Sequence, residues 1–220
     1  MIPYNRQSID NSDIKAVVRT LKSNYLTQGP NVEKFEKSVS EYTNCKYSVA
    51  FNSGTSALHI ACLSLGLKKN DYLWTVPNSF VASANCALYC NAKIDFVDID
   101  INNFNISIIY LETKLKLAKK KGKLPKILVP VHLGGQPTYQ EKIYRLSKKY
   151  GFKILEDATH SIGAIRNGNM VGNCRWSDIT IFSFHAVKII TTAEGGMALT
   201  NSNYLCQKLQ LLRSHGITRD

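Results

Sequence analysis

The chain has 220 residues, of which 44% are hydrophobic and 20% are charged, and its net charge is +12. The length predicts one globular unit, or at most one and a half at the usual domain size of roughly 100–200 residues. This composition excludes a disordered chain, a collagen and a coiled coil.

Short apolar runs alternate with helical periodicities along the chain. The predicted helices are 12–23, 32–43, 55–65, one that begins after 78, 107–121, 139–150 and one after 201. The predicted strands are 47–51, 72–76, 94–97, 127–131, 153–156, 179–183 and 197–200. This alternation is typical of an α/β domain with a mostly parallel sheet between helices, and such sheets bind ligands at the carboxyl ends of their strands.

The high positive charge raises the question of a polyanionic partner. The lysines gather mainly in residues 114–126 and 142–153, without the interleaved aromatic side chains of a nucleic-acid platform. A lysine-rich composition on solvated helix faces accounts for most of the charge, and phosphate-bearing small molecules fit it as well as nucleic acid does. We therefore predict no nucleic-acid partner.

The first residues lack the apolar stretch of a secretory signal, so we expect a cytoplasmic protein whose six cysteines are reduced. These cysteines form no C-x-x-C pair and lack zinc-finger spacing to a histidine, and no metal site is predicted. The longest uncharged stretch, residues 72–92, contains Pro77 and several Asn and Ser residues, which argues against a membrane span. We predict no membrane partner.

The first candidate site is the turn at residues 52–57, between a predicted strand and a predicted helix. Gly54 permits a sharp turn, and the backbone amides of Thr55 and Ser56 could hold a phosphate with help from the helix dipole. The simpler interpretation is a helix cap by Ser53 or Thr55. The residues alone leave both interpretations open.

The second candidate site is Glu156-Asp157, followed by His160, at the end of a predicted apolar strand. Burial of a carboxylate there is unfavourable unless a cationic partner is supplied. A carboxylate beside a cationic ring nitrogen stays ionised and keeps that nitrogen protonated. A helix cap or a surface ion pair is the alternative.

The third candidate site is Lys188, which follows the predicted strand that ends at Ser183. Its apolar neighbours Val187, Ile189 and Ile190 predict partial burial, which would lower the pKa of the amine toward a nucleophilic form. The segment 194–196, Glu-Gly-Gly, allows close approach of another backbone. A solvated lysine is the ordinary alternative.

Taken together, these segments resemble the DegT/DnrJ/EryC1/StrS sugar aminotransferases, a family of fold-type I enzymes that use pyridoxal 5'-phosphate (PLP). The resemblance runs from residue 2 to residue 220. It is carried by Leu-Thr-Gln-Gly at 26–29, Asn-Ser-Gly-Thr-Ser-Ala at 52–57, Pro-Asn-Ser-Phe-Val-Ala at 77–82, Glu-Asp at 156–157 and Phe-Ser-Phe-His-Ala-Val-Lys at 182–188. Within the family, residues 183–196 and 213–216 look most similar to enzymes that act on UDP-4-keto-6-deoxy-N-acetylhexosamines, in the pathway to pseudaminic acid.

The resemblance implies a role for each matching residue. Lys188 matches the lysine that binds the cofactor covalently, and Asp157 matches the carboxylate that pairs with the pyridine nitrogen. The other cofactor-binding matches are Gly54, Thr55, Ser56 and Ser183 on the phosphate side, Phe80 on the ring face and His160 near the ring hydroxyl. Tyr4, Thr27 and Gln28 match segments on the sugar-nucleotide side.

The resemblance also implies an overall function. Residues 1–220 are expected to be the PLP-binding large domain of a homodimeric enzyme, without the smaller C-terminal domain of the family. The implied reaction transfers an amino group from glutamate to C4 of the keto sugar. A lysine at position 188 favours amino transfer over the related 3-dehydratases, which have histidine there. The alternative is a catalytically silent homologue that acts as a binding or regulatory module.

Overall fold

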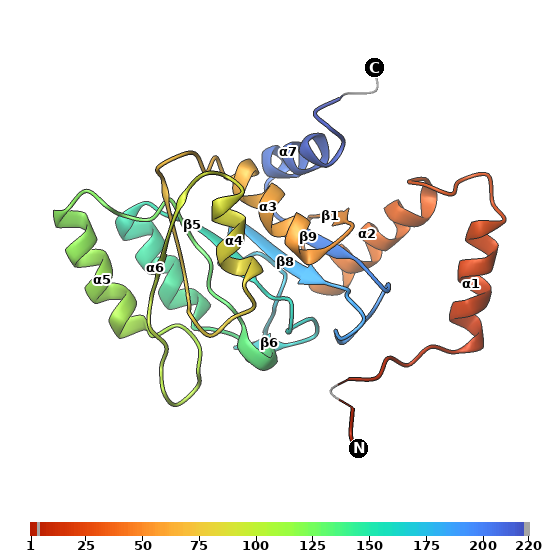
Figure 1. Cartoon of the computed structure of the whole chain (residues 1–220), viewed down its shortest axis with the longest axis horizontal. Coiled ribbons are helices and arrows are strands. Elements are labelled where there is room, and N and C mark those ends of the chain that lie inside the picture. Colours follow the sequence, from red (N-terminus) through yellow and green to blue (C-terminus); the bar gives the residue numbers. More distant parts are fainter. Residues whose placement is uncertain (4, 218–220) are drawn as a thin grey trace.

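The computed structural model describes residues 1–3 and 5–217. A seven-stranded sheet in the order β1-β9-β8-β5-β4-β2-β3 forms its centre (Figure 1). The strands are β1 (Tyr47–Phe51), β2 (Tyr72–Thr75), β3 (Lys93–Phe96), β4 (Ile127–Leu128), β5 (Lys153–Asp157), β8 (Ile179–Ser183) and β9 (Gly196–Thr200). The helices are α1 (Asn11–Leu21), α2 (Pro30–Thr43), α3 (Gly54–Ser64), α4 (Ala82–Leu88), α5 (Ile108–Lys120), α6 (Gln140–Tyr150) and α7 (Asn203–Arg213), with a short 3-10 helix at Leu133–Gly135.

The sheet is mostly parallel, as predicted. Strands β3, β2, β4, β5 and β8 pair in parallel, whereas β9 pairs antiparallel with both β1 and β8. Because β9 runs the other way, it begins where β1 and β8 end, and Gly196 is paired with both Phe51 and Ser183. The connection from β1 to α3 and the connection from β8 to β9 therefore meet at one edge of the sheet.

Helices cover both faces of the sheet. The core on one face combines side chains of α3, α4 and α7 with inward residues of the strands, such as Leu155 and Ile181. On the other face, α5 and α6 pack over Trp74 and Ile154, and α2 packs over Phe182. Figure 1 shows α5 and α6 side by side at one end of the molecule and α1 apart from the sheet at the other end.

The main departures from the predicted elements have local causes. Strand β4 stops at Leu128 because Pro130 has no N–H to continue the ladder, although Val131 still bridges to Asp157. The loop predicted after Asp157 contains a small hairpin of β6 (Ile165–Arg166) and β7 (Asn169–Met170). Its turn is Asn-Gly at 167–168, both with positive φ, a hairpin signal that was present in the sequence.

All six cysteines are buried and free, as the sequence predicts for reduced thiols. Within the described part of the chain, no helix has the length and apolar character needed to cross a bilayer. In the same described residues, no three His, Cys, Asp or Glu side chains lie close enough together to hold a metal ion.

Helix α5 offers a matched test of this core. Leu115 is completely buried, whereas Leu117, two residues later, is 54% exposed. We expect Leu115→Ala to lower the free energy of unfolding by about 2–5 kcal/mol, because it leaves a cavity between α5 and the sheet. Leu117→Ala should change it by less than about 0.5 kcal/mol. Urea unfolding followed by circular dichroism measures both, and equal effects would contradict the packing of α5.

Candidate active site

The turn that begins α3 is enclosed by the neighbouring strands at this edge. A Cβ on Gly196 would collide with the carbonyl of Ser53 and would lie 2.6 Å from the backbone nitrogen of Gly54. A Cβ on Gly54 would lie 3.0 Å from the Cβ of Ser183. The close backbone approach predicted for the Glu-Gly-Gly segment is thus confirmed, and it fixes the start of α3 against β8 and β9.

Ser53 caps α3, so the capping interpretation of this turn holds. Its hydroxyl accepts the N–H of Ser56 at 3.1 Å and lies 3.0 Å from the Ser56 hydroxyl. By helix geometry, the amides of Gly54 and Thr55 in the first turn have no acceptor within the helix. The cap therefore uses the amide of Ser56 and leaves other first-turn amides free to donate at the edge of the sheet. Such amides at a helix start stabilise a bound anion.

Asp157 ends β5 and is only 3% exposed. Its carboxylate accepts a hydrogen bond of 2.5 Å from the hydroxyl of Ser83 on α4 and one of 3.2 Å from the N–H of Thr159. Ser83 in turn lies 2.9 Å from the hydroxyl of Ser79. These contacts orient a buried carboxylate with neutral donors, and among the described residues no cationic side chain lies within ion-pair distance of it.

Lys188 and His160 both lie within the electrostatic reach of Asp157. Burial lowers the pKa of the half-buried Lys188 amine, and the negative charge of Asp157 opposes this shift. The pKa of His160 is lowered by burial first and by the charge of Lys188 second, again against the effect of Asp157. The three predicted residues are therefore brought together from two separate segments, the end of β5 with the turn after it and the loop after β8.

The burial of Lys188 does not come from its neighbours in sequence. Val187, Ile189 and Ile190 are all exposed, so the sequence-based reason for a desolvated lysine was wrong although partial burial is confirmed. The N-terminal segment reaches this loop, because the side-chain amide of Asn5 donates to the carbonyl of Ala186 at 2.9 Å.

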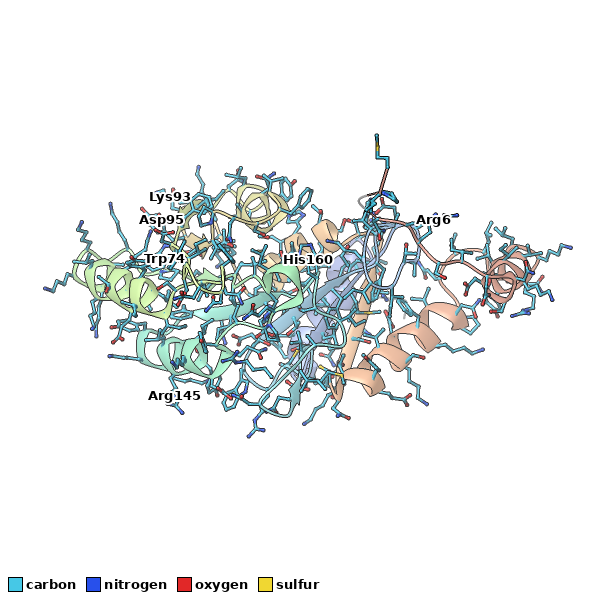
Figure 2. All side chains as sticks on the ribbon, turned by 90° about the horizontal axis from the view of Figure 1, so that it is seen from below. Arg6, Trp74, Lys93, Asp95, Arg145 and His160 are labelled. Carbon is cyan, nitrogen blue, oxygen red and sulfur yellow. The ribbon has the colours of Figure 1, made fainter. Side chains whose placement is uncertain are left out.

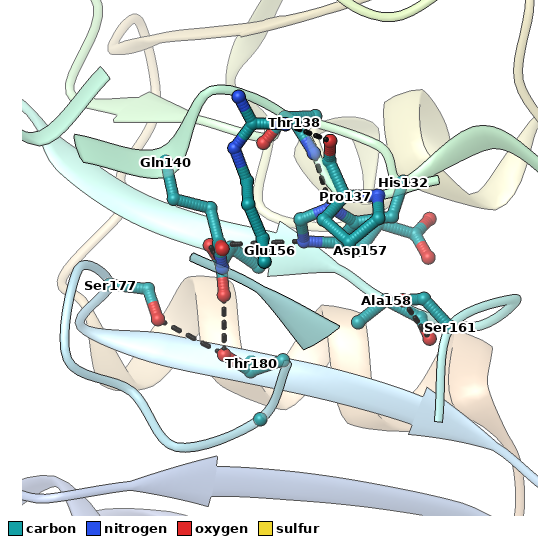
Figure 3. Close-up of polar contacts among 12 residues, drawn as sticks. His132, Pro137, Thr138, Gln140, Glu156, Asp157, Ala158, Ser161, Ser177 and Thr180 are labelled. Atoms are coloured by element: carbon teal, nitrogen blue, oxygen red, sulfur yellow. Dashed lines mark hydrogen bonds and ion pairs between the residues drawn. The ribbon is translucent and has the colours of Figure 1, made fainter. Parts of the chain in front are cut away.

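Glu156 lies on the opposite face of the sheet and has a different environment (Figure 3). Its carboxylate accepts hydrogen bonds from Gln140 at 2.6 Å and from Thr180 at 2.8 Å. The Nε2 atom of the fully buried His132 lies 3.8 Å from it, and burial is the main reason why the pKa of His132 is lowered. Neutral donors thus satisfy Glu156 within the core, away from the residues around Asp157.

The remaining predicted residues occupy the surroundings. Phe80 is 71% exposed, and its carbonyl accepts the N–H of Ser83, the residue bonded to Asp157. Thr27 and Gln28 line a groove of about 1110 Å³ together with Asn52 and Ser56. The groove thus joins the predicted sugar-nucleotide side to the start of α3.

Tyr4 was predicted as a site residue, whereas Ser83 was not. Tyr4 lies outside the described residues. Ser83 was not predicted, although its position five residues after Asn78, in the helix that follows a strand, is a signal that could have drawn attention to it.

Comparison with known proteins identifies the family of the chain. Residues 7–220 match the DegT/DnrJ/EryC1/StrS aminotransferase family. The chain belongs to this family. The family resemblance inferred from the sequence motifs is thereby confirmed.

The relatives are longer than this chain. It is 43% identical over 219 residues to a UDP-4-amino-4,6-dideoxy-N-acetyl-beta-L-altrosamine transaminase of Campylobacter jejuni, and it covers 56% of that protein. It is 36% identical over 219 residues to an uncharacterized protein of Methanocaldococcus jannaschii, of which it covers 55%. The chain thus spans a little over half the length of these curated relatives.

Solved structures confirm the fold. Helicobacter pylori PseC, an aminotransferase involved in the biosynthesis of pseudoaminic acid, superposes with a TM-score of 0.88 at 35% identity, over 99% of this chain and 57% of that one. A Streptococcus pneumoniae protein described as a sugar aminotransferase, in its PLP form, superposes with a TM-score of 0.87 at 28% identity, over 99% of this chain and 59% of that one. The predicted fold-type I arrangement is thus shared with these structures.

The opposing effects of burial and Asp157 predict the pH dependence of Lys188. Because burial lowers the pKa of its amine, half of the Lys188 side chains should be neutral at a pH below the ordinary lysine pKa of about 10.4. Removing the opposing charge in Asp157→Asn should move the midpoint to still lower pH. Acylation of Lys188, followed by mass spectrometry across a pH series, measures this midpoint.

The control is Glu194→Gln, which removes an exposed carboxylate from the same loop. It should leave the midpoint of Lys188 near that of the unchanged chain. A midpoint that stays the same or rises in Asp157→Asn would show that these two groups do not interact.

Proposed function

We propose that residues 1–220 form the PLP-binding large domain of a nucleotide-sugar aminotransferase. The reaction moves an amino group from glutamate to C4 of a UDP-4-keto-6-deoxy-N-acetylhexosamine. The observation that carries this proposal is the pairing of a half-buried amine, Lys188, with a buried carboxylate, Asp157, at the sheet edge where α3 begins. Family membership supports the same conclusion.

The residues present fit PLP at both of its ends. The phosphate suits the start of α3, where first-turn amides, Thr55, Ser56 and the neighbouring Ser183 offer donors around a tightly closed turn. The ring nitrogen suits Asp157, whose hydrogen-bond donors Ser83 and Thr159 are neutral, because a carboxylate favours a protonated ring nitrogen beside it. When bound, PLP supplies an electron sink for the carbon that gains or loses a proton.

Each side chain then has a distinct task. The Nζ atom of Lys188 binds the cofactor and moves the proton at the reacting carbon of the substrate, a base role commonly worth 10²–10⁴ in rate. Its lowered pKa serves this role, because the neutral amine is the form that accepts a proton. With PLP bound, Asp157 would keep the ring nitrogen protonated, the exposed ring of Phe80 would be available for stacking, and we assign His160 to the hydroxyl side of the ring on the family resemblance.

The groove supplies the sugar-nucleotide side of the proposal. Thr27 and Gln28 line it beside Ser56, so a ligand that fills it would reach the start of α3. We assign Tyr4 to the same side on the family resemblance alone. The transaminase from Campylobacter jejuni and PseC support a UDP-linked 4-amino-4,6-dideoxy sugar as the product.

We further propose a homodimer in the cytoplasm for the whole protein. Helix α1 has no buried residue and exposes Ile14, Val17 and Leu21, which a partner surface would cover. The six free cysteines suit a reducing compartment. Light scattering of the purified protein tests the dimer.

Covalent attachment at Lys188 is the direct test. After incubation with PLP and reduction with borohydride, mass spectrometry should find the modification on the peptide that contains Lys188. Lys188→Arg should abolish this modification while it keeps a positive charge at the position, and Lys69→Arg, at an exposed site, should not. Modification of Lys188→Arg to the same extent as the unchanged chain would refute the assignment.

Gly196 provides a second test, on the phosphate side. Gly196→Ala must displace the Ser53-Gly54 backbone that it touches, so we expect the affinity for PLP to fall at least about tenfold. Gly66→Ala is the control for a general loss of stability, because Gly66, just after the other end of α3, has a φ of +78° that strains any side chain, while a Cβ there meets nothing within 4 Å. Fluorescence titration with PLP measures both, and equal affinities would contradict the proposed phosphate position.

The second candidate is a catalytically silent homologue that acts as a binding or regulatory module. The two candidates differ in turnover. A chain that attaches PLP at Lys188 but does not convert the keto sugar with glutamate is such a module, whereas release of the 4-amino sugar identifies the enzyme.

A further inference from the structure

The positive charge of the chain is concentrated in one region. Residues 108–153 contain eleven lysines and one arginine but only two acidic residues, which gives +10 of the total net charge of +12. The 107 residues before this region and the 67 after it carry +1 each. A lysine-rich composition spread over the whole surface would not produce this asymmetry.

The fold gathers these charges on one layer. Helices α5 and α6 pack side by side over the same core, and the connection between α5 and β4 continues the layer. We call the exposed cationic side chains of this layer the basic surface. They are Lys116, Lys119, Lys120, Lys121, Lys123, Lys126, Lys142, Arg145, Lys148, Lys149 and Lys153. Figure 2 shows Arg145 at the outer side of α6, directed away from the sheet.

The two acidic residues of the region neutralise little of this charge. Glu112 lies 3.3 Å from Lys116 and 3.6 Å from Lys149 and is shared between them. Glu141 accepts a hydrogen bond from the side-chain amide of Asn167 at 3.1 Å. The basic surface therefore keeps a large excess of positive charge.

Exposed apolar side chains lie among these lysines. Ile109 is 77% exposed and Leu117 is 54% exposed, while Leu111 and Leu115 on the opposite side of α5 are completely buried. At 100° per residue, Ile109, Lys116, Leu117 and Lys120 share the outward side of the helix. Apolar side chains flanked by lysines on one helix face are typical of helices that lie in a membrane interface.

We infer that the basic surface docks peripherally on an anionic lipid bilayer. Lysines are attracted by the diffuse negative potential of such a surface, and Ile109 and Leu117 would enter the headgroup region. Nucleic acid fits less well, because phosphate recognition favours the planar fork of arginine, and eleven of the twelve cations of the region are lysines. This inference departs from the sequence-based predictions that the charge only solvates helix faces and that the chain has no membrane partner, and it does not depend on the proposed function.

Docking in this way would leave the candidate active site open. The basic surface belongs to the layer of α5 and α6, whereas Asp157 directs its carboxylate to Ser83 of α4 on the other face of the sheet. Membrane contact and ligand binding thus use different surfaces of the molecule.

Vesicle sedimentation tests the inference. The full chain should bind vesicles of an equal mixture of phosphatidylglycerol and phosphatidylcholine, should not bind pure phosphatidylcholine, and should dissociate as salt is raised. Replacing Lys116, Lys119, Lys120 and Lys121 by Gln should weaken binding about 100-fold or more. The matched control replaces Lys15, Lys34, Lys68 and Lys69, four exposed lysines outside the region, and should weaken it less than about threefold. Equal losses in the two variants would overturn the inference.

A second variant separates a bilayer from other polyanions. Ile109→Ser combined with Leu117→Ser keeps every charge, and because both side chains are exposed it should not unfold α5. We expect it to weaken vesicle binding about tenfold and to leave the weak, salt-sensitive binding of duplex DNA unchanged. Unchanged vesicle binding, or tighter binding of DNA than of anionic vesicles at the same salt concentration, would overturn the lipid assignment.

Discussion

The site depends on one electrostatic constraint: a carboxylate buried at the end of β5. Asp157 is surrounded by neutral donors, with Ser83 and Thr159 holding its oxygens. A buried charge of this kind is stable only when donors orient it and a cation can approach it. The chain places the amine of Lys188 within its electrostatic reach while burial makes that amine easier to deprotonate. The carboxylate therefore raises the pKa of the amine against the effect of burial, and the proposed chemistry follows from these two groups.

The reversed direction of β9 makes this arrangement possible. It brings Gly196 to the ends of β1 and β8, where a side chain of any size would displace the turn before α3. Close backbone contact thus replaces side-chain packing at the point where α3 begins. The result is a rigid helix start beside the carboxylate and amine, which is the preorganised geometry that an anionic group at a helix terminus requires.

The layers of the molecule separate two kinds of surface. The layer of α3 and α4 faces the candidate active site, whereas the layer of α5 and α6 carries most of the net charge and exposes Ile109 and Leu117. Since the sheet lies between them, the positive charge of the α5 and α6 layer is separated from the candidate active site. We propose that this separation lets the chain hold a membrane surface and a nucleotide sugar at the same time.

The sequence by itself determined the order of helices and strands, because apolar periodicity and turn residues are local signals, and its motifs determined the family. It also indicated Asp157, which directly follows the predicted apolar strand 153–156, and Lys188, which lies five residues after the strand that ends at Ser183. The tertiary structure alone decided which residues meet. The bond from Ser83 to Asp157 joins residues 74 positions apart, and Lys188 is partly buried although its sequence neighbours are exposed. Contacts at such distances leave no periodic signal in the sequence.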